Sequence, residues 1–516
     1  MTDFHLLDSI YPLALDELPR QWVLGRGAAG LPQEWEHRTF RGWTLAAHRD
    51  AHVCRLEDGA GAPIGWVLEP MLHTDAGGAA TPKERVRLAA EGEVTEAALE
   101  HALYGRDANG HSDGTGLEGM WIAIVLTDAI KRVYLGPIHS VMFDAAKRRI
   151  ATSHNLLQPF ARDLELSRAF DPLATLAFFS FGLTAFRGVE RLLPNHYLDL
   201  DRFAPVRHCP RVPAEQGESA RIAAAMTEHG RRIIAEIARE EDSITIPLSA
   251  GNDSRAVLAA CRSLVEAGFP VKLFTSVGTD FDTRIDLQGA SALARIAGLP
   301  LEVRSRQRHA AAPAEQVMRM FARLGEAKSG PSLSNPALLQ APLPLDASGQ
   351  APTLTLPGMG GEVGRGTYYW GDAQAGAQPA ELLRRVGTPL TEQTVKAADR
   401  WLQNLPAFIR DRPADLLDLA YVEQRLGCWE ANTRYLWPGR PKVLSFMVSG
   451  FCIEQVFRLP VAYRRSGRLQ RDMIAYGWPE LLAVPINRAT GFLWFNHQAR
   501  KIARPIKRRV VGALRR

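Results

Sequence analysis

The pattern of hydrophobic and polar positions changes near residue 215. Before it, short apolar stretches that often alternate with polar residues are separated by glycine-containing turns, which is typical of antiparallel β-strands. The stretch 204–214 contains prolines and arginines and is interpreted as a linker. The pattern therefore predicts a β-rich domain over residues 1–203. Its clearest strands are expected at residues 119–126, 131–137 and 149–153.

After residue 215, apolar residues at helical spacing alternate with short β-branched stretches. This alternation is typical of a doubly wound parallel sheet, in which ligands bind at the carboxyl ends of the strands. Helical patterns dominate beyond about residue 312, although residues 354–356 predict one more strand. We therefore expect an α/β protein whose second domain, residues 215–496, has a parallel sheet and a helical C-terminal part. The expected elements are helices at 219–240, 254–267 and 285–297 and strands at 243–248, 271–276 and 301–304.

Composition fits a globular protein with large cores. The chain has 516 residues, of which 46% are apolar, and this length favours two or three domains. Its five cysteines lie far apart without a Cys-x-x-Cys pair, which argues against a structural zinc or a disulfide framework and for a reducing compartment. The first residues lack the pattern of a signal peptide, and no segment is apolar for long enough to span a bilayer. We expect a cytoplasmic protein.

The net charge of +6 is concentrated in the last twenty residues. The tail, residues 497–516, contains eight lysines and arginines and no acidic residue, so the rest of the chain is close to neutral. Its apolar residues recur at roughly helical spacing, and such a tail could contact an anionic membrane. Pro505 interrupts the helical pattern and favours a solvated tail. No specific nucleic-acid partner is expected.

A loop of small residues, Ser-Ala-Gly-Asn-Asp-Ser at 249–254, follows the strand expected at 243–248 and begins a helix. Small residues let backbone N–H groups approach an anion, and the unpaired N–H groups and dipole of the helix favour negative charge. Ser249 and Ser254 add hydroxyl donors, and Asp253 suits a Mg²⁺ ion held between protein and pyrophosphate. The loop therefore predicts phosphate binding.

This loop resembles the PP-loop, Ser-Gly-Gly-x-Asp-Ser, of the ATP pyrophosphatases, which split ATP into AMP and pyrophosphate. It has neither the order of a Walker A loop nor that of a dinucleotide fingerprint. Ala250 stands where the family has its first glycine, and its methyl group is tolerated only if the backbone keeps a negative φ. The resemblance implies ATP contacts from Leu248, Ser249, Gly251, Asp253 and Ser254.

A second glycine-rich loop, residues 357–366, follows the strand expected at 354–356. It resembles the Ser-Gly-Glu-Gly-Ser-Asp-Glu signature of asparagine synthetases, with Glu362 at the place of the aspartate. Met359 and Val363 replace the other two acids. The resemblance implies a catalytic and Mg²⁺-binding role for Glu362, with Asp253 as the second metal ligand. It implies ATP contacts from Pro357, Gly358, Gly360 and Gly361.

Two further segments add to this resemblance. Residues 274–278 resemble the segment that contacts adenine in asparagine synthetases, which implies an ATP contact from Val277. Residues 467–471 resemble a segment whose lysine stabilises the acyl-adenylate, and Arg468 stands in its place as a candidate catalytic residue. Arginine keeps the charge but cannot act as a proton shuttle. Tyr421 and Glu423 are interpreted as packing and surface residues.

The first domain contains, in order, a Gly-x-Trp segment in the strand expected at 119–126, a Val-Tyr-Leu-x-Pro segment in that at 131–137, and a late Arg-Leu-Leu-Pro-Asn-His segment at 191–196. This order resembles the glutaminase-like half of asparagine synthetases, a class II amidotransferase fold with an αββα sandwich. In active members, a cysteine at position one of the mature chain is the nucleophile. Here Thr2 follows the initial methionine, and the nearest cysteine, Cys54, lies within an expected strand. We therefore expect this domain to lack glutaminase activity and to serve as a scaffold.

Together these resemblances imply an asparagine synthase-like ligase that uses ATP and Mg²⁺. It would adenylate a small-molecule or peptide carboxylate, release pyrophosphate, and transfer the acyl group to an amine or ammonia; a homodimer is compatible with this function. One alternative is a non-catalytic ATP-binding scaffold, with which Ala250, Met359 and Val363 agree. Another is a PP-loop enzyme that modifies nucleic acid, which usually needs a cysteine pair.

Overall fold

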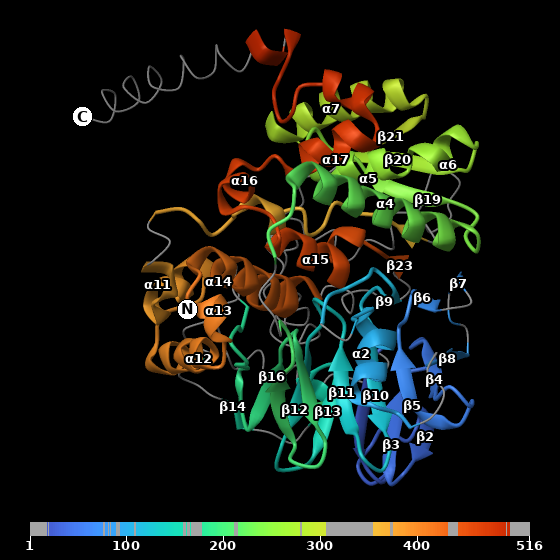
Figure 1. The fold of residues 1–516 in the computed structure, drawn as a ribbon, viewed down its shortest axis with the longest axis vertical. Coiled ribbons are helices and arrows are strands. Elements are labelled where there is room, and N and C mark those ends of the chain that lie inside the picture. Colours follow the sequence, from blue (N-terminus) through green and yellow to red (C-terminus); the bar gives the residue numbers. More distant parts are fainter. Residues whose placement is uncertain are drawn as a thin grey trace.

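The computed structural model shows an α/β protein with several sheets, one of them parallel (Figure 1). A β-sandwich forms the lower half of the view, and the parallel sheet with its helices forms the upper half. The expected α/β class is confirmed. The structure describes residues 18, 20–75, 78–80, 82, 84–88, 93–107, 110–157, 161–162, 166, 178–210, 215–278, 281–305, 354–371, 375–431, 442–491 and 493–495.

The sandwich consists of a six-stranded and a seven-stranded sheet. In the first sheet neighbouring strands are antiparallel, and in the second the pair β4–β8 is parallel and the others are antiparallel. The first has the order β16 (Val189–Leu192), β12 (Val141–Asp144), β13 (Arg149–Ala151), β1 (Trp22–Arg26), β3 (Trp43–Ala47), β2 (Glu36–Phe40). The second has the order β18 (Ala204–Arg207), β17 (His196–Asp199), β11 (Lys131–Leu135), β10 (Ile122–Leu126), β5 (Pro63–Leu68), β4 (Val53–Glu57), β8 (Arg85–Arg87).

The two sheets enclose an apolar core. Trp22 and Trp43 on the first sheet and Trp66 and Ile124 on the second belong to one buried cluster. Alternate residues of the second sheet face outward and pack against helix α2 (Glu96–Tyr104), which covers that face. These strands form because apolar side chains occur on both faces, so burial on both sides stabilises the sheet.

The linker predicted at residues 204–214 is wrong at its start, because a strand begins there. Residues Ala204–Arg207 form β18, which pairs with β17 and places Pro205 opposite Leu198. Proline lacks a backbone N–H, and β18 lies at the edge of its sheet, where one side of the strand makes no ladder. A proline in the sequence is therefore compatible with this strand. Residues 211–214 lie outside the described part of the chain.

The second half is built on a five-stranded parallel sheet. The chain runs from β19 through β20 to β21 on one side, then returns to β22 and β23 on the other side of β19. The strand order therefore reverses between β19 and β22. The strands are β21 (Leu301–Ser305), β20 (Val271–Val277), β19 (Ile244–Pro247), β22 (Leu354–Thr355) and β23 (Lys442–Val443).

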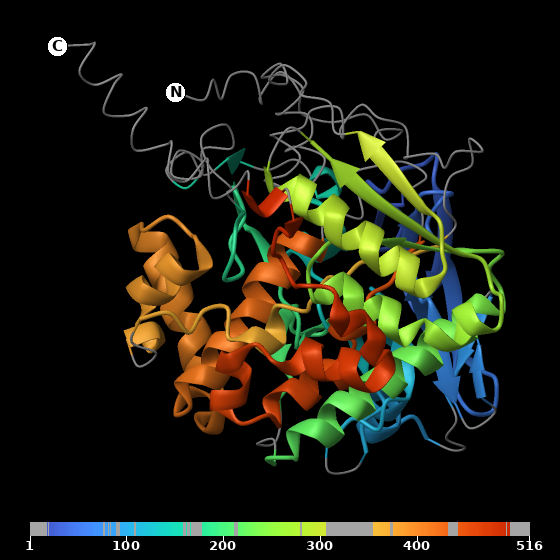
Figure 2. The same ribbon diagram turned by 90° about the horizontal axis from the view of Figure 1, so that it is seen from above.

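The helices agree with the predicted alternation. Helix α4 (Ser219–Ala238) packs against α5 (Asp253–Ala260) and α17 (Leu469–Gly477), and α7 (Phe281–Ala297) packs against β20 and β21. The helix expected at 254–267 is divided into α5 and α6 (Arg262–Glu266) at Cys261. Seen from above, a group of helices drawn in orange stands beside this unit (Figure 2). It includes α11 (Pro379–Val386), α12 (Glu392–Gln403), α13 (Ala407–Arg410) and α14 (Pro413–Ala420).

Buried polar contacts join the sandwich to the C-terminal helices. The interpretation of Glu423 as a surface residue is wrong, because its side chain is fully buried and forms a two-point ion pair with Arg207 of β18, at 2.6 and 2.8 Å. Asn195 and Trp401 donate further hydrogen bonds to the same carboxylate. Burial alone raises the pKa of Glu423, but Arg207 and the hydrogen bonds outweigh it, so the pKa is lowered.

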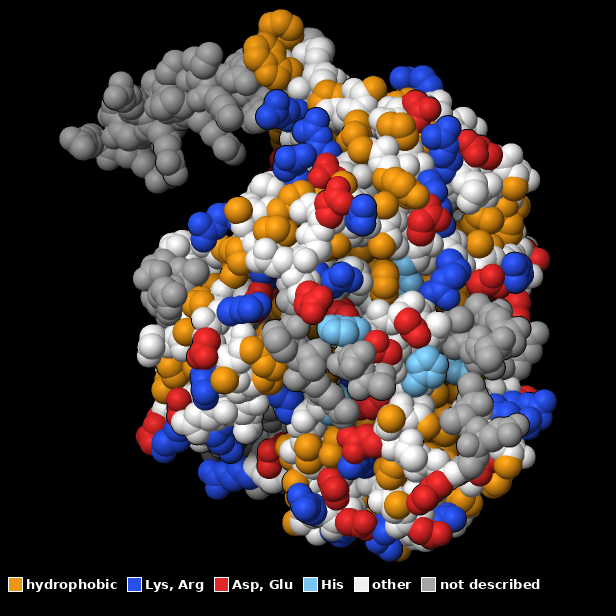
Figure 3. All heavy atoms as spheres, viewed as in Figure 1, with side chains coloured by type: hydrophobic (Ala, Val, Ile, Leu, Met, Phe, Trp, Pro, Cys, Tyr) orange, Lys and Arg blue, Asp and Glu red, His pale blue; other side chains and the backbone are white. Residues whose placement is uncertain are grey.

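The outer surface of the molecule carries both acidic and basic side chains, interspersed on the face shown in Figure 3. The basic tail, residues 497–516, lies outside the described residues, as does Thr2. None of the helices in the described part of the chain is both long and apolar enough to cross a membrane.

Candidate phosphate-binding site

Two loops meet at the point where the strand order of the parallel sheet reverses. The first loop, residues 248–252, leads from β19 into α5, and the second, residues 356–362, follows β22. Since β19 and β22 are neighbours and parallel, both loops leave the same edge of the sheet. A crevice beyond the carboxyl ends of two such strands is the usual ligand position in open α/β sheets. The structure thus brings together the two loops that the sequence singled out.

Glycine is required where these loops touch. A Cβ atom on Gly358 would lie 2.6 Å from the backbone nitrogen of Ser254, and one on Gly361 would lie 2.3 Å from Oδ1 of Asp253. Gly360 has φ +88°, in the region that favours glycine, and a Cβ there would meet Val448. Any side chain at Gly358 or Gly361 would push the second loop away from the N-terminus of α5.

Internal hydrogen bonds hold the first loop in shape. Ser254 Oγ accepts the N–H of Ser249, and Ser249 Oγ accepts the N–H of Gly251, both at 3.1 Å. The N–H of Ala250 donates to Asp286 Oδ1 of α7 at 3.0 Å. The two serines therefore brace the loop as well as offering hydroxyl donors. Asn252 makes no side-chain cap on α5, so the N–H groups of the first turn of α5 remain oriented for an anion.

Ala250 fits the loop without backbone strain. It is not among the described residues with a positive φ, and its side chain is buried. The methyl group lies against Gly289 of α7, where an added Cβ would come within 2.5 Å of the Ala250 Cβ. The extra methyl group in the loop is thus accommodated by a glycine on the facing helix.

Asp253 and Glu362, the two expected metal ligands, lie on either side of Arg365. Nη2 of Arg365 is 3.1 Å from Asp253 Oδ2 and 3.4 Å from Glu362 Oε1. Asp253 Oδ1 is buried and has no hydrogen-bond partner among the described residues. Burial raises the pKa of Asp253 to about 6, although Arg365 opposes this shift. A buried acceptor without a partner is a costly feature in a folded protein and is typical of functional sites.

These residues fit Mg²⁺, provided that phosphate oxygens complete the coordination. Within the described ranges, no group of three or more His, Cys, Asp or Glu side chains is arranged to hold a metal ion. Magnesium usually takes one or two carboxylates from the protein together with waters and substrate phosphates. Asp253 and Glu362 supply two carboxylates beside the helix N-terminus, where a phosphate would lie.

The other predicted residues lie around these two loops in different ways. The side chain of Leu248 is buried, and its N–H donates to the carbonyl of Phe274 in β20. Only the rest of its backbone could therefore contact an ATP. Val277 ends β20 and is partly exposed. Pro357 leads from β22 into the second loop. Arg468 precedes α17; its side chain is 64% exposed and lies 3.8 Å from Asp472, and no ion pair joins it to Asp253 or Glu362 among the described residues.

Sequence reasoning missed the residues that fix the first loop. The fully buried Arg255 donates to the carbonyls of Ala250 and Val484, at 3.0 and 2.7 Å, and the N–H of Asn487 donates to Ala250 O at 3.1 Å. Burial lowers the pKa of Arg255 to about 10. The contacts with Val484 and Asn487 join residues more than 200 positions apart, so local sequence contains no signal for them.

Cys54 lies in the middle of β4, as predicted. Its side chain is fully buried, and burial raises the pKa of the thiol to about 12. A nucleophilic cysteine must be accessible and ionised. The geometry of Cys54 therefore does not suit an amidotransferase nucleophile. All five cysteines are free thiols.

A buried Ser-His-Glu cluster does not form a hydrolytic triad. Ser449 Oγ lies 3.0 Å from His229 Nε2, but Glu118 Oε1 contacts the same nitrogen, at 3.2 Å. A triad needs the serine and the carboxylate on opposite ring nitrogens, so that one nitrogen can take the proton while the other is held. Ser449 also caps α15 (Gly450–Phe457), which gives it a structural role.

The chain was compared with protein-family models and with curated protein sequences. Neither a protein-family model nor a curated protein sequence matches this chain.

Proposed function

We propose that the protein is an ATP-dependent ligase of the asparagine-synthase type. It would activate a carboxylate as an acyl-adenylate, release pyrophosphate, and pass the acyl group to an amine or to ammonia. The observation that carries the proposal is the meeting of the Ser249–Ser254 loop with the Gly358–Glu362 loop at the reversal point of the parallel sheet. Their likeness to the two signatures of that family supports the same reading.

In this proposal the first turn of α5 binds the phosphates of ATP. Its N–H groups and the positive end of its dipole favour an anion, and the Ser249 and Ser254 hydroxyls add donors. Gly358 and Gly361 allow the second loop to lie directly against this turn, so both loops can contact the same nucleotide. Val277, at the end of β20, is the candidate contact for adenine.

Asp253 and Glu362 are the proposed ligands of Mg²⁺. The ion would neutralise the charge that develops on pyrophosphate as it leaves. Without it, Arg365 compensates both carboxylates. A guanidinium group also binds phosphate oxygens well, so the same side chain can turn from the carboxylates to the pyrophosphate. The charge of the exposed Arg468 would act on the phosphates at longer range.

The nitrogen donor is proposed to be ammonia or an amine on a second substrate. Release of ammonia from glutamine by a class II amidotransferase requires an accessible nucleophile, and the buried Cys54 does not supply one. The sandwich would then act as a scaffold whose loops and strands support the C-terminal helices, as the Arg207–Glu423 pair does.

Isotope exchange between pyrophosphate and ATP tests this proposal. The protein is incubated with ATP, Mg²⁺, labelled pyrophosphate and a panel of carboxylates, and we expect label in ATP with at least one of them. Asp253→Asn should abolish the exchange, whereas Glu266→Gln, which changes an exposed carboxylate on α6, should leave it unchanged. Binding of ATP without exchange for any carboxylate would contradict the ligase.

A non-catalytic ATP-binding scaffold is the second candidate. Val363, at the position of a family acid, is buried in the apolar core, so this position no longer supplies a carboxylate to the site. Met359 replaces the other acid. The exchange experiment separates the two candidates, because a scaffold binds ATP but does not form an adenylate.

A further inference from the structure

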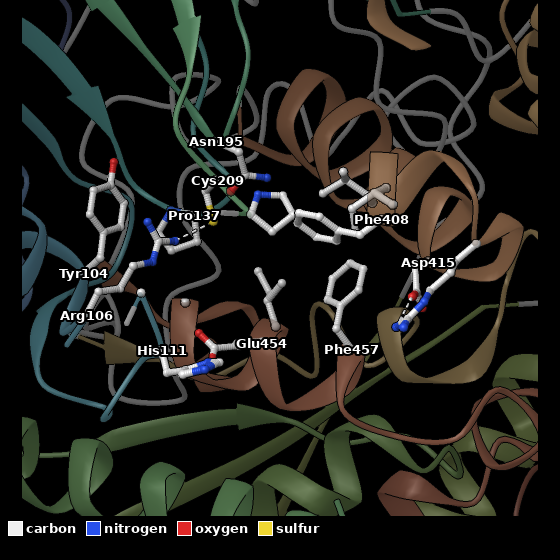
Figure 4. Close-up of a pocket in the computed structure, with 17 residues that line it drawn as sticks. Tyr104, Arg106, His111, Pro137, Asn195, Cys209, Phe408, Asp415, Glu454 and Phe457 are labelled. Carbon is white, nitrogen blue, oxygen red and sulfur yellow. Dashed lines mark hydrogen bonds and ion pairs between the residues drawn. The ribbon is translucent and has the colours of Figure 1, made fainter. Parts of the chain in front are cut away.

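A cavity of about 70 Å³ lies where the β-sandwich meets the C-terminal helices (Figure 4). This volume has room for about five water-sized groups, which suits a small organic molecule. Its described lining does not include residues 249–254 or 357–362, so it is distinct from the phosphate-binding loops. The sandwich side contributes Arg106, His111, Asn195 and Cys209, and helices α13 and α15 contribute Phe408, Glu454 and Phe457.

The cavity has an apolar end and a polar end. Phe408 and Phe457 point toward each other at one end, and Arg106, His111 and Glu454 lie at the other (Figure 4). Ile453 and Leu419 extend the apolar wall. A ligand with a hydrocarbon body and one polar head matches this division, since the body is removed from water while the head keeps polar partners.

The charges at the polar end favour a cationic head. Arg106 is already compensated, because its Nη1 is 2.9 Å from Glu100 Oε2, and its Nη2 lies 2.7 Å from Cys209 Sγ. Beyond the apolar end, Asp415 is paired with the buried Arg464 and lies 3.8 Å from Nη1 of Arg412, which also lines the cavity. The cationic groups of this lining are therefore mostly neutralised by acids that belong to the fold.

Glu454 is in a different situation. Among the described residues its ion-pair partner is His111, with Nδ1 3.4 Å from Oε1. Glu454 Oε2 accepts the N–H of Ser112 at 2.8 Å. A carboxylate has about four acceptor positions, so Glu454 can accept more hydrogen bonds. Burial raises its pKa, although the Ser112 N–H, Arg106 and His111 oppose this shift.

We propose that this cavity binds a small primary amine with an apolar body. The ammonium group pairs with Glu454, and the hydrocarbon part lies between Phe408 and Phe457, whose ring faces also attract a cation. An ammonium group has three donors and no acceptor, which complements a carboxylate with open acceptor positions. The proposal does not depend on the ligase function, because the cavity shares no described residue with the two loops.

Binding of three probes of similar shape tests the proposal. The full-length protein is titrated calorimetrically with 3-methylbutylamine, 3-methylbutanol and 3-methylbutanoate. We expect the amine to bind at least ten-fold more tightly than the alcohol and to raise the melting temperature, and we expect no binding of the carboxylate. Equal affinity for amine and alcohol, or tighter binding of the carboxylate, would overturn the proposal.

Two variants locate the site. Glu454→Gln should weaken amine binding at least ten-fold and leave the affinity for the alcohol unchanged, which also shows that the cavity is intact. His111→Lys alters a side chain that is 41% exposed and places a permanent ammonium group beside Glu454, so it should abolish amine binding. Glu392→Gln, an exposed carboxylate on α12, is the control. If Glu454→Gln does not fold, His111→Lys decides, and retained amine affinity in it refutes the proposal.

Discussion

Ala250 and Gly289 share one small volume beside the phosphate-binding loop. The loop can carry a methyl group at position 250 because α7 carries none at position 289. Interiors are packed closely enough that one methyl group decides whether two elements fit. The departure of Ala250 from the PP-loop pattern is therefore compensated locally and does not by itself argue against ATP binding.

A double-mutant cycle tests this compensation. Gly289→Ala alone is expected to destabilise the protein by about 1–3 kcal/mol, because the new Cβ would meet that of Ala250 at 2.5 Å. Ala250→Gly combined with Gly289→Ala removes the contact between the two Cβ atoms and should recover part of the loss, since the new Cβ would still lie 2.7 Å from the Cα of residue 250. Denaturant unfolding measures all four proteins. Additive effects of the two changes would show that they do not share this volume.

The contact between Gly361 and Asp253 gives a second prediction. Gly361→Ala places a Cβ 2.3 Å from Asp253 Oδ1 and should weaken ATP binding at least ten-fold, because the second loop must move away from α5. Gly25→Ala, whose Cβ would find its nearest neighbours at an ordinary 3.5 Å, is the matched control for removing a glycine. Calorimetric titration with ATP and Mg²⁺ provides the affinities. Unchanged affinity in Gly361→Ala would contradict the assigned site.

The pKa of Asp253 predicts a dependence of stability on pH. Burial raises this pKa from 3.8 to about 6, so the folded protein holds the proton more tightly than the unfolded chain. The contribution of Asp253 to the free energy of unfolding is then complete at low pH and falls as the pH rises from about 4 to about 6. Asp253→Asn removes this titration.

The free energy of unfolding of Asp253→Asn, minus that of the wild type, should therefore rise over this interval and level off above about pH 6. Urea unfolding at a series of pH values measures it. A difference that is flat with pH, or that falls, would show that the carboxylate is not destabilised in the folded protein.

Among the helices and strands, the local sequence pattern is sufficient to predict the parallel sheet and its helices. It is insufficient to predict the contacts between elements. The alternation of helix and strand, and the loops after β19 and β22, depend on short-range spacing and turn chemistry, which the sequence displays directly. Glu423 and Arg255 are charged residues in helical segments and look like surface positions in the sequence. Both are fully buried and bind partners far away in the chain: Glu423 pairs with Arg207, and Arg255 donates to the carbonyl of Val484.

The strand β18 was missed for a related reason. Its proline suggested a linker, and only the strand order shows that this proline lies at the edge of a sheet. Asp286 was visible as an acid at a helix start, but its bond to the Ala250 N–H depends on how α7 packs. Tertiary placement, and not local propensity, decides each of these cases.

The buried pair between β18 and the C-terminal helices predicts a large effect on stability. Glu423→Gln removes the charge opposite Arg207 and should cost about 3–5 kcal/mol, because a buried guanidinium is left without compensation. Glu392→Gln breaks an exposed pair with Lys396 and should cost less than about 1 kcal/mol. Chemical unfolding compares the two. Similar small losses in both would show that the Arg207–Glu423 pair does not hold the halves together.

For the whole molecule, the proposed reaction and the amine cavity are assigned to different places. The two loops that we propose to bind phosphate lie at the edge of the parallel sheet, whereas the cavity lies where the sandwich meets α13 and α15. The sandwich contributes buried contacts to the C-terminal helices through Arg207, and through Ser140, whose Oγ donates to Gly427 O at 2.6 Å. We therefore propose that the second half of the chain binds ATP and that the first half supports the second.

The most direct measurement is a crystal structure of the protein with Mn²⁺ and an ATP analogue whose α–β bridge cannot be cleaved. The account predicts an anomalous Mn²⁺ peak bound by Asp253 and Glu362, phosphates at the first turn of α5, and Arg365 turned from the carboxylates to the phosphates. A nucleotide bound elsewhere, or a site in which Arg365 keeps both carboxylates and no metal is seen, would contradict it.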